Sequence, residues 1–304
     1  MRGTRPRLVT IGDLTLDVVV HADAGVEVGT DVPSSVAFRA GGSAANTARA
    51  FSRLGGVAVF MGAVGTDAVG RAAAAFLGSE GVRARVIRRP GKTARLIVLV
   101  SESGERSFLT DRGVADQFPP SALEDPQVAV ADALHLPAYS LLKKPLASTA
   151  LKAARVARKA GALVSVDLAS RRPLMAGGPA AARARIVAVR ADVLFANHEE
   201  AGALVGQHSL RALLELAPVA VVKAGAAGCE VMWANGQIVV RARPMKVTDT
   251  TGAGDAFDAG FLYSLISTGR AIDALRSIDL RHAAYDGQKA AAAFIRGKRV
   301  ELAL

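Results

Sequence analysis

Residues 249–257, Asp-Thr-Thr-Gly-Ala-Gly-Asp-Ala-Phe, place a carboxylate where a glycine-rich turn leads into an apolar, strongly helical stretch. Small residues let the backbone approach a ligand closely, and the first amides of a helix, here those of residues 252–255, point outward without partners. Such amides and the helix dipole together attract anions such as phosphate. The segment therefore predicts an anion-binding turn with Asp255 beside it. The alternative is that Asp255 is only an N-cap, a common use of aspartate, but a plain cap requires neither the glycines nor the threonines.

The rest of the chain must supply the scaffold for this turn. Apolar β-branched runs alternate with alanine-rich helical patterns along most of the sequence. This alternation predicts a three-layer α/β fold, a doubly wound, mostly parallel sheet with helices on both faces. Residues 7–20 read as one strand on which Asp13 and Asp17 share a face. Residues 43–56 read as a helix with Ser43 as its N-cap.

Two stretches interrupt the alternation and read as hairpins. Residues 93–111 contain two strand patterns with a turn at residues 103–104, and residues 229–242 contain two more with a turn at residues 235–236. The first hairpin and the end of the first strand do not fit a parallel sheet, so we expect a small second sheet that forms a lid. The expected organisation is a single domain, 1–304, with lid segments at 13–22, 34–40 and 93–112.

The composition indicates a globular and basic protein. Of its 304 residues, 51% are hydrophobic and 21% are charged, and the formal net charge is +11. The basic residues are dispersed, mostly on alanine-rich helices. The sequence has no zinc-ligand spacing and no aromatic-and-basic RNA-binding motif. We therefore expect an anionic small molecule as ligand and no nucleic acid as partner.

Cysteine content and hydropathy indicate the compartment. Cys229 is the single cysteine, which rules out an internal disulfide and fits a reducing environment. The apolar run after the basic N-terminus is interrupted by Asp13 and Asp17, unlike a signal peptide. No uncharged stretch reaches the roughly 18 residues needed to span a bilayer. We expect a cytoplasmic protein without a membrane partner.

Two segments resemble the signatures of one family, the ribokinase-like (PfkB) carbohydrate kinases. Residues 249–261, DTTGAGDAFDAGF, resemble the C-terminal signature, and residues 40–55, AGGSAANTARAFSRLG, resemble the N-terminal one. The resemblance extends from about residue 8 to residue 296, and the first hairpin takes the place of the family's β lid. It implies a phosphoryl transfer that depends on ATP and Mg²⁺.

The resemblance also implies roles for the residues of the glycine-rich turn. Asp255 corresponds to the base that takes the proton from the acceptor hydroxyl, and the amides of Gly252, Ala253 and Gly254 correspond to the anion hole. Phosphoryl transfer depends mainly on positioning and electrostatics. A carboxylate at a helix N-terminus is expected to stay ionised and weakly basic, which suits such a base.

On the nucleotide side, the resemblance implies that three further residues and two glycines bind ATP and Mg²⁺. Asn197 and Glu200 match an Asn-x-x-Glu motif that organises Mg²⁺, with Glu200 acting through water; their alternative is a helix cap. Lys223, Gly225 and Gly228 match the stretch along the nucleotide, and their alternative is a plain turn between strands.

A monovalent cation, K⁺ in many relatives, is a further expectation. Asp249 and the carbonyl of Thr251 match part of the family's cation site. The C-terminal segment FIRGKRVELAL, residues 294–304, departs from the pattern that completes this site.

For the acceptor, the resemblance assigns hydroxyl binding to two aspartates and the N-terminal signature; the residues are Asp13, Asp17, Gly41, Gly42 and Asn46. Ser43 stands where ribokinases carry lysine, which argues against ribose. Ala169 stands where many sugar kinases carry asparagine, which argues against fructose. Arg112 either meets an acidic or phosphorylated group of the substrate or is solvated.

The sequence thus predicts a kinase that phosphorylates a hydroxymethyl group of a sugar or sugar-like acceptor. A nucleoside kinase of the adenosine or pseudouridine type is an alternative; it would need an aromatic base pocket, for which Phe38 and Phe108 are candidates among 5% aromatic residues. A non-catalytic sugar- or nucleotide-binding regulator is a further alternative, against which Asp255 argues. Exposed edges of the lid predict a homodimer through it.

Overall fold

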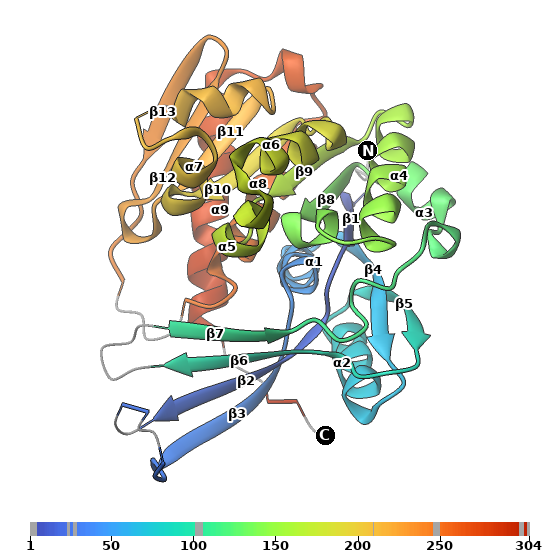
Figure 1. Cartoon of the computed structure of the whole chain (residues 1–304). Coiled ribbons are helices and arrows are strands. Elements are labelled where there is room, and N and C mark those ends of the chain that lie inside the picture. The colour runs from blue at the N-terminus through green and yellow to red at the C-terminus, as the bar shows by residue number, and fades with distance from the viewer. Residues whose placement is uncertain are drawn as a thin grey trace.

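The large sheet of the protein has nine strands. A computed structural model describes residues 5–22, 25–26, 29–100, 106–208, 210–245, 250–297 and 301–302. The strand order is β13-β12-β11-β10-β9-β8-β1-β4-β5 (Figure 1). All pairings are parallel except those of β12 with β11 and with β13. The strands are β1 (Arg7–Ile11), β4 (Val57–Gly65), β5 (Arg83–Arg89), β8 (Ala133–Pro137), β9 (Leu163–Asp167), β10 (Val193–Asn197), β11 (Val219–Lys223), β12 (Cys229–Trp233) and β13 (Gly236–Val240).

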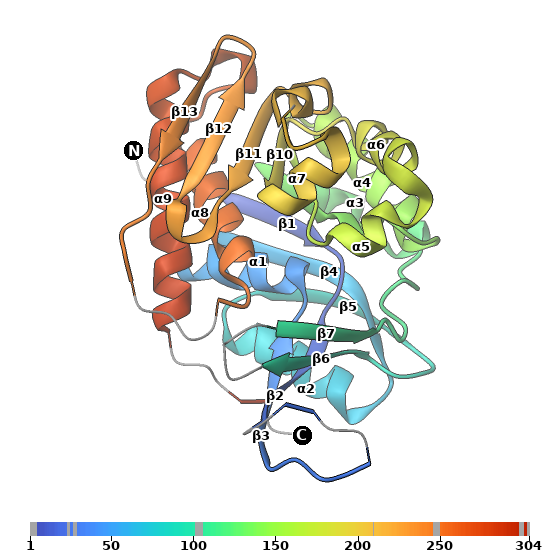
Figure 2. The ribbon, with the colours of Figure 1, turned by 60° about the vertical axis from the view of Figure 1, so that its left-hand side comes forward.

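Helices cover both faces of this sheet, so the predicted doubly wound α/β fold is confirmed. Figure 2 shows α8 and α9 on one side of it and α4 and α6 on the other. The helices are α1 (Ser43–Arg53), α2 (Ala68–Ser79), α3 (Asp125–Ala129), α4 (Leu146–Lys159), α5 (Arg171–Leu174), α6 (Gly178–Val189), α7 (His198–Val205), α8 (Ala253–Ser267) and α9 (Ser277–Arg296). Short 3₁₀ turns are η1 (Pro120–Ala122), η2 (Ala138–Leu141), η3 (Met175–Gly177), η4 (Leu210–Glu215), η5 (Gly225–Ala227) and η6 (Ile272–Ala274).

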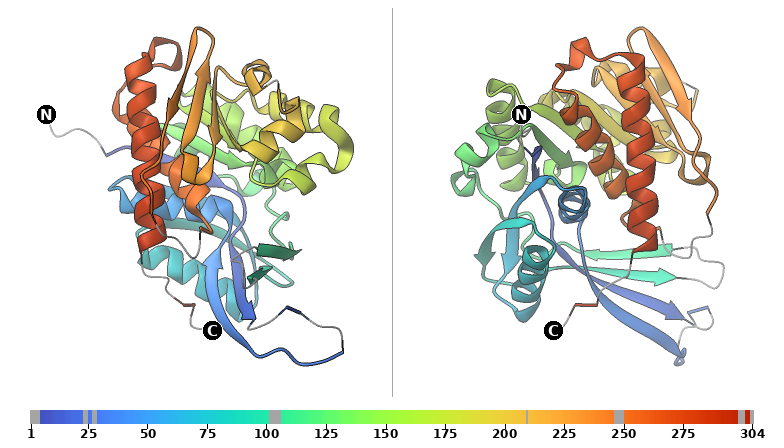
Figure 3. Two further views of the ribbon diagram at one scale, coloured as in Figure 1. Left: turned by 90° about the vertical axis from the view of Figure 1, so that its left-hand side faces the viewer. Right: turned by 180° about the vertical axis from the view of Figure 1, so that it is seen from behind.

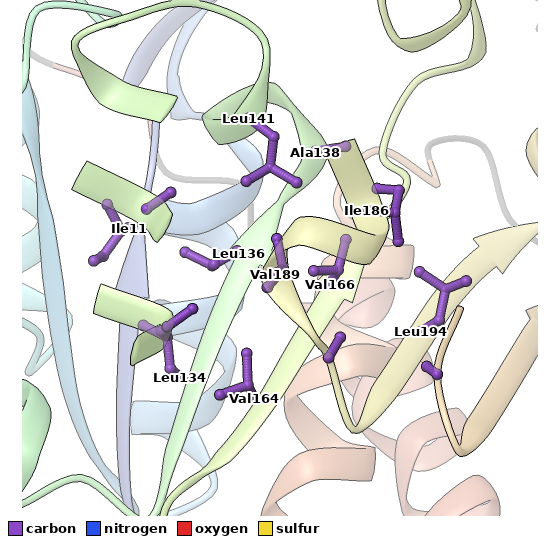
Figure 4. Packing of buried hydrophobic residues seen from close by; sticks show 14 of the residues in the cluster. Ile11, Leu134, Leu136, Ala138, Leu141, Val164, Val166, Ile186, Val189 and Leu194 are labelled. Carbon is purple, nitrogen blue, oxygen red and sulfur yellow. The ribbon is translucent and has the colours of Figure 1, made fainter. Parts of the chain in front are cut away.

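The two hydrophobic cores lie on opposite faces of the large sheet because successive side chains of a strand alternate. In β1, Val9 and Ile11 belong to the core under α4 and α6, whereas Leu8 belongs to the core under α1, α8 and α9. Figure 4 shows part of the first core, in which Ile186 and Val189 of α6 lie near sheet residues. Burial on both faces explains why these strands read as continuous apolar runs.

A separate four-stranded sheet, called the small sheet below, has the order β3-β2-β6-β7. Its strands are β2 (Thr15–Ala22), β3 (Ser34–Gly41), β6 (Ala94–Val100) and β7 (Arg106–Asp111). The turn expected at residues 103–104 lies outside the described residues. The small sheet extends from one end of the large one (Figures 1 and 3), and α9 runs along the outside of α8.

The prediction of one strand over residues 7–20 is wrong. The chain leaves the large sheet after Ile11 and enters the small sheet at Thr15, so Asp13 lies in the connection and not on a strand with Asp17. The change of sheet is possible at Gly12, where a Cβ would lie only 2.8 Å from Ser140 Oγ and 2.9 Å from Ala44 Cβ.

The second hairpin also differs from the prediction by one residue. Trp233 pairs with Gly236, so the two-residue turn is Ala234-Asn235 and not residues 235–236. A Cβ on Gly236 would lie 2.5 Å from Trp233 Cζ2, so the glycine makes room for the indole ring within the strand pair. Among the described residues, no helix is long and apolar enough to cross a membrane.

Candidate active site

The glycine-rich turn leads into α8, which begins at Ala253 with Gly252 as its N-cap. Gly252 has φ 78°, in the left-handed region, and a Cβ there would lie 2.7 Å from Phe294 Cε1. Both the backbone conformation and the close approach therefore require glycine. Asp255 is the third helical residue, so the alternative that it is merely the N-cap is wrong.

The carboxylate of Asp255 is held from α1, at the opposite end of the sequence. Ser43 Oγ donates to its Oδ1 at 2.5 Å, and Asn46 Nδ2 donates to its Oδ2 at 3.0 Å. The expected N-cap role of Ser43 is wrong, because Gly42 is the N-cap and Ser43 is the first helical residue. Ser43 and Asn46 lie one turn apart and therefore reach the same carboxylate.

Burial raises the pKa of Asp255 to about 6, although the hydrogen bonds from Ser43 and Asn46 oppose the shift. The expectation of a weakly basic carboxylate is thus wrong in direction, since desolvation outweighs the stabilising donors. A general base is most effective with a pKa near the working pH. The surroundings of Asp255 therefore favour proton abstraction at neutral pH.

The amides of the turn are not equally available. Ala253 N donates to Thr250 O at 3.0 Å, so this amide is engaged within the turn. A Cβ on Gly254 would lie 3.3 Å from Lys223 Nζ, which places an ammonium group directly beside the turn. An anion at this helix N-terminus would meet both the helix dipole and this positive charge.

Lys223, at the end of β11, is bound by two carboxylates. Its Nζ lies 3.0 Å from Asp258 Oδ1 and 3.2 Å from Asp167 Oδ1. Burial favours the neutral amine, but the charges of Asp167 and Asp258 outweigh it and raise the pKa of Lys223. Burial also raises the pKa of the fully buried Asp258 well above its ordinary value, against the opposing effect of Lys223.

Asn197 and Glu200 form a reciprocal cap of α7. Glu200 N donates to Asn197 Oδ1 at 2.8 Å, and Asn197 N donates to Glu200 Oε2 at 2.9 Å. The capping alternative is therefore present in the structure. Burial raises the pKa of Glu200 to about 7, and the charge of Asp167 adds to this.

The carboxylates around Lys223 carry more negative charge than this one lysine can offset, and a divalent cation would neutralise part of the excess. Asp167, Glu200, Asp255 and Asp258 interact electrostatically with this one lysine. No cluster of three or more His, Cys, Asp or Glu that could hold a metal occurs in the part of the chain that the structure describes. A Mg²⁺ ion here would have to take most of its ligands from water and substrate phosphates, as this ion commonly does.

The two glycines after β11 occupy different surroundings. Gly228 has φ 105°, and a Cβ there would lie 2.0 Å from Val240 O, so the turn alternative accounts for this glycine. Gly225 has φ 54°, with no atom within 4 Å of a Cβ. The backbone at Gly225 is therefore open for a ligand to approach.

The paired glycines of the N-terminal signature shape the acceptor side. A Cβ on Gly41 would lie 2.0 Å from Asp17 Oδ2, and a Cβ on Gly42 would lie 2.4 Å from Asp13 O. Thr15 Oγ1 donates to Asp17 Oδ1 at 2.5 Å. Burial nevertheless raises the pKa of Asp17 to about 7, and Asp13 and Asp255 contribute to the shift through their charges.

Arg112 is not solvated, so that alternative is wrong. Its Nη1 lies 2.7 Å from Asp13 Oδ2, its Nη2 lies 2.7 Å from Asp116 Oδ1, and its guanidinium lies 5.0 Å from the centre of the Tyr139 ring. Two carboxylates therefore neutralise this cation already. Asp13 Oδ1 is buried and has no hydrogen-bond partner among the described residues, so it is a free acceptor on this side.

One predicted residue lies outside the described part of the chain, and two buried residues near the site were not predicted from the sequence. Asp249 is outside the described residues, whereas Thr251 lies in the turn before α8. Asp258 was missed, although a carboxylate three residues after Asp255 in an apolar helix was a usable signal. His135 was also missed; burial lowers its pKa to about 4, and its Nδ1 lies 3.0 Å from Ser165 Oγ.

Known proteins are similar to this chain in sequence and in fold. An ATP-dependent ribose-1-phosphate kinase from Halopiger xanaduensis is 33% identical over 269 residues, covering 86% of either chain. The solved structure of an adenosine kinase from Sinorhizobium meliloti is similar with a TM-score of 0.82 and 25% identity, over 97% of this chain and 95% of that one. A fructokinase from Vibrio cholerae O395, solved with fructose, ADP and calcium, gives a TM-score of 0.78 and 26% identity, over 96% and 94%.

The match to a family is nearly complete in length. The sequence model of the pfkB family carbohydrate kinases covers residues 5–301. This match includes the glycine-rich turn, the N-terminal signature and both sheets. The chain therefore belongs to the pfkB family of carbohydrate kinases.

Proposed function

We propose that this sugar kinase transfers the γ-phosphate of ATP to a hydroxymethyl group of a sugar or sugar-like acceptor, with Asp255 as the general base. The observation that carries the proposal is the position of the Asp255 carboxylate. It lies at the N-terminus of α8, between the donors Ser43 and Asn46 and next to the turn that adjoins Lys223. A base and an anion-attracting turn are thus adjacent, as transfer to a hydroxyl requires.

In the proposed reaction, the acceptor hydroxyl lies between Asp255 and the γ-phosphorus. Its oxygen attacks the phosphorus, its proton passes to Asp255, and the bond to the bridging oxygen breaks to release ADP. The free amides at the start of α8 and the charge of Lys223 stabilise the negative charge of the transferring group. Mg²⁺, when bound to the nucleotide near Glu200 and Asp167, would neutralise phosphate charge.

The nucleotide and cation roles belong to the same proposal. Gly225 would lie along ATP at the end of β11, with Gly228 shaping the turn beside it, and Asn197 and Glu200 would organise Mg²⁺ through water. Asp249 and the Thr251 carbonyl would hold K⁺. Replacing potassium by sodium salts at constant ionic strength is expected to lower kcat if that site exists, and equal rates in the two salts would remove it.

The acceptor is proposed to bind through Asp13, Asp17 and Asn46, beside Gly41 and Gly42. Free hydroxyls suit these groups, because buried carboxylate oxygens accept hydrogen bonds from them. Asp13 Oδ1 has no partner in the described part of the chain, and it would accept one such bond. The named relatives act on a sugar, a sugar phosphate or a nucleoside, which are the classes to compare.

One observation favours a nucleoside as the second candidate. Val98 of β6 pairs with Val19 on one side and with Phe108 on the other, so these three side chains share a face of the small sheet. Asp17 lies two positions before Val19 in β2 and is therefore on the same face as Phe108. Phe108 is 53% exposed and could stack on a base. Phe38 pairs with Val18 and lies on the opposite face.

The decisive experiment measures ADP release with ATP and Mg²⁺ across sugars, sugar phosphates, sugar acids and nucleosides. The wild type is compared with Asp255→Asn and with Asp273→Asn, a matched change at an exposed position. Turnover on one acceptor class that is lost only in Asp255→Asn would establish the reaction and its class. Turnover that survives in Asp255→Asn would exclude this residue as the base. Silence of the wild type on every acceptor, with ATP still bound, would favour a non-catalytic binding protein.

A homodimer through the small sheet is also proposed. On the face opposite Asp17, Phe38, Ile97 and Leu109 form one row across neighbouring strands, and each is at least 37% exposed. A contiguous apolar patch of this kind commonly marks a protein interface. Leu109→Lys is expected to give monomers in sedimentation experiments if the wild type is a dimer. A monomeric wild type would refute the proposal.

A further inference from the structure

Arg49 of α1 is an almost fully buried arginine close to the proposed base. Only 8% of the residue is exposed. Its guanidinium carbon lies 4.7 Å from the centre of the Phe76 ring and 5.8 Å from that of Phe294, and its Nε lies 3.5 Å from Glu80 Oε2. Charged side chains are rarely buried without a specific set of partners.

Two further contacts of Arg49 lead to the site. Its Nη1 donates to Asn46 Oδ1 at 3.3 Å and to Ala40 O, at the end of β3, at 3.4 Å. Arg49 and Asn46 are three residues apart in α1, so their side chains share a face of the helix. The other end of the same amide, Asn46 Nδ2, donates to Asp255 Oδ2.

The amide of Asn46 is therefore oriented from both ends. A guanidinium can only donate hydrogen bonds, and an ionised carboxylate can only accept them. The carbonyl oxygen of Asn46 must then face Arg49, and its NH₂ group must face Asp255. With the amide flipped, its oxygen would oppose the carboxylate and its NH₂ group would oppose the guanidinium, so both contacts would become repulsive.

We propose that Arg49 is a positioning residue for the base: it fixes the orientation of the Asn46 amide, and Asn46 in turn holds Asp255 Oδ2. This inference rests on the proposed role of Asp255. Arg49 acts only through Asn46 and does not itself touch the reacting groups. Without the guanidinium, the Asn46 amide is oriented from the Asp255 side alone, so its hydrogen bond to Oδ2 is less well defined, and Ser43 is left as the firm donor to the carboxylate.

The neighbouring Arg53 provides a matched control on the same helix. Arg53 Nη2 lies 2.6 Å from the same Glu80 oxygen, and its guanidinium carbon lies 5.8 Å from the centre of the same Phe294 ring. Within the part of the chain that the structure describes, Arg53 makes no hydrogen bond to Asn46. A general effect of losing a cation from α1 would therefore appear in both Arg49→Met and Arg53→Met.

The test is a double-mutant cycle on kcat with Arg49→Met, Asn46→Ala and the double variant. Arg49→Met keeps an apolar side chain of similar length between the two phenylalanines. We expect a loss of about 10-fold to 100-fold in kcat, of the size that a displaced catalytic group causes, and a normal rate in Arg53→Met. In the Asn46→Ala background, Arg49→Met should cost nothing further, since coupled residues are not additive.

The pH profile provides a second readout that a purely structural role would not change. Loss of the Asn46 donor should raise the pKa of Asp255, so the acid limb of kcat should move to higher pH in Arg49→Met and stay in place in Arg53→Met. The other polar and charged groups around Asp255 are unchanged in all variants; they are Ser43 on α1, Asp17 on β2, Asp167 on β9, Glu200 on α7, Lys223 on β11 and Asp258 on α8.

Arg49→Lys keeps the experiment decisive if Arg49→Met does not fold. The lysine retains a charged donor, so Arg49→Lys should keep a higher kcat than Arg49→Met when Asn46 is present. In the Asn46→Ala background it should give no such advantage. The inference would be overturned if either Arg49 variant lowered kcat as much in the Asn46→Ala background as in the wild-type background. It would also be overturned if neither variant lowered kcat in the wild-type background. A wild type that is inactive on every acceptor would instead refute the proposed function.

Discussion

At the residue scale, Asp255 is governed by two opposing effects on one carboxylate. Desolvation favours its protonated form, whereas the donors Ser43 and Asn46 favour the ionised form, and desolvation prevails. The residue is thus a better base than a solvent-exposed aspartate. The same energetic cost of ionisation must appear in the stability of the fold.

The pH dependence of the reaction follows from this pKa. The base acts as a carboxylate, so kcat should fall about tenfold per pH unit below a limb near pH 6, the pKa of Asp255. Ser43→Ala removes one donor to the ionised form and should therefore move this limb to higher pH. Steady-state rates between pH 4.5 and 8 measure both. A limb near pH 4 in the wild type would contradict the assigned environment.

The stability of the fold should fall as the pH rises, whereas kcat should increase. Burial raises the folded-state pKa of Asp255 from the ordinary value of 3.8 to about 6, so the folded state binds its proton more tightly, and stability is lost as the pH rises from about 4 to about 6. Asp255→Asn removes this loss. Its melting temperature should exceed that of the wild type at pH 7 by about 2 °C or more, and the difference should vanish near pH 4. A difference independent of pH would refute this account.

At the element scale, α1 connects the two sheets to the site. It follows β3 directly after Gly42, and its first turn supplies both donors to Asp255, the proposed base on α8. The pairing of β2 with β3 places Asp17 close to this junction. Changes at the junction should therefore affect acceptor binding more than the chemistry.

Gly41→Ala tests this placement. The new Cβ would meet the Asp17 carboxylate at 2.0 Å, so the carboxylate must move, and the KM for the acceptor should rise at least tenfold while the KM for ATP stays constant. Gly78→Ala is the matched control, since nothing lies within 4 Å of its Cβ in α2. Replacing a glycine inside a helix should leave the kinetics unchanged and stabilise the fold by roughly 0.5–1 kcal/mol. An unchanged acceptor KM in Gly41→Ala would argue against Asp17 as a ligand.

At the scale of the whole molecule, two long-range contacts tie the small sheet to the body. Arg112, just after β7, pairs with Asp13 in the connection between the sheets. Near the other end of the chain, Leu302 N donates to Phe38 O of β3 at 2.8 Å, and the side chain of Leu302 is buried. This second contact covers part of an edge strand that would otherwise be free to pair.

Deletion of residues 301–304 tests the contribution of this C-terminal contact. Without it, β3 should open more readily, and amide hydrogen exchange over residues 34–41 should be faster. Exchange over residues 163–167, in the middle of the large sheet, should be unchanged and serves as the internal control. Equal exchange of β3 in the full-length and shortened chains would show that the contact contributes nothing to the small sheet.

Much of the fold was predictable because its signals are local. Runs of apolar residues predicted the buried parallel strands, and the change of pattern after residue 93 predicted a second sheet. Where a prediction failed, a distant contact was responsible. The strand predicted over residues 7–20 is divided because the chain changes sheets. The hairpin turn before Gly236 is shifted because the ring of Trp233 lies close to this glycine.

The sequence by itself determined the glycine-rich turn, the two signatures and thereby the family, since these features depend on residue type and short spacing. Only the tertiary structure decided which groups meet. Ser43 reaches Asp255 across 212 residues, and Arg112 reaches Asp13 across 99. It also decided that Lys223 is bound by Asp167 and Asp258. Hydrogen bonds, ion pairs and desolvation depend on distance in space, and folding alone sets those distances.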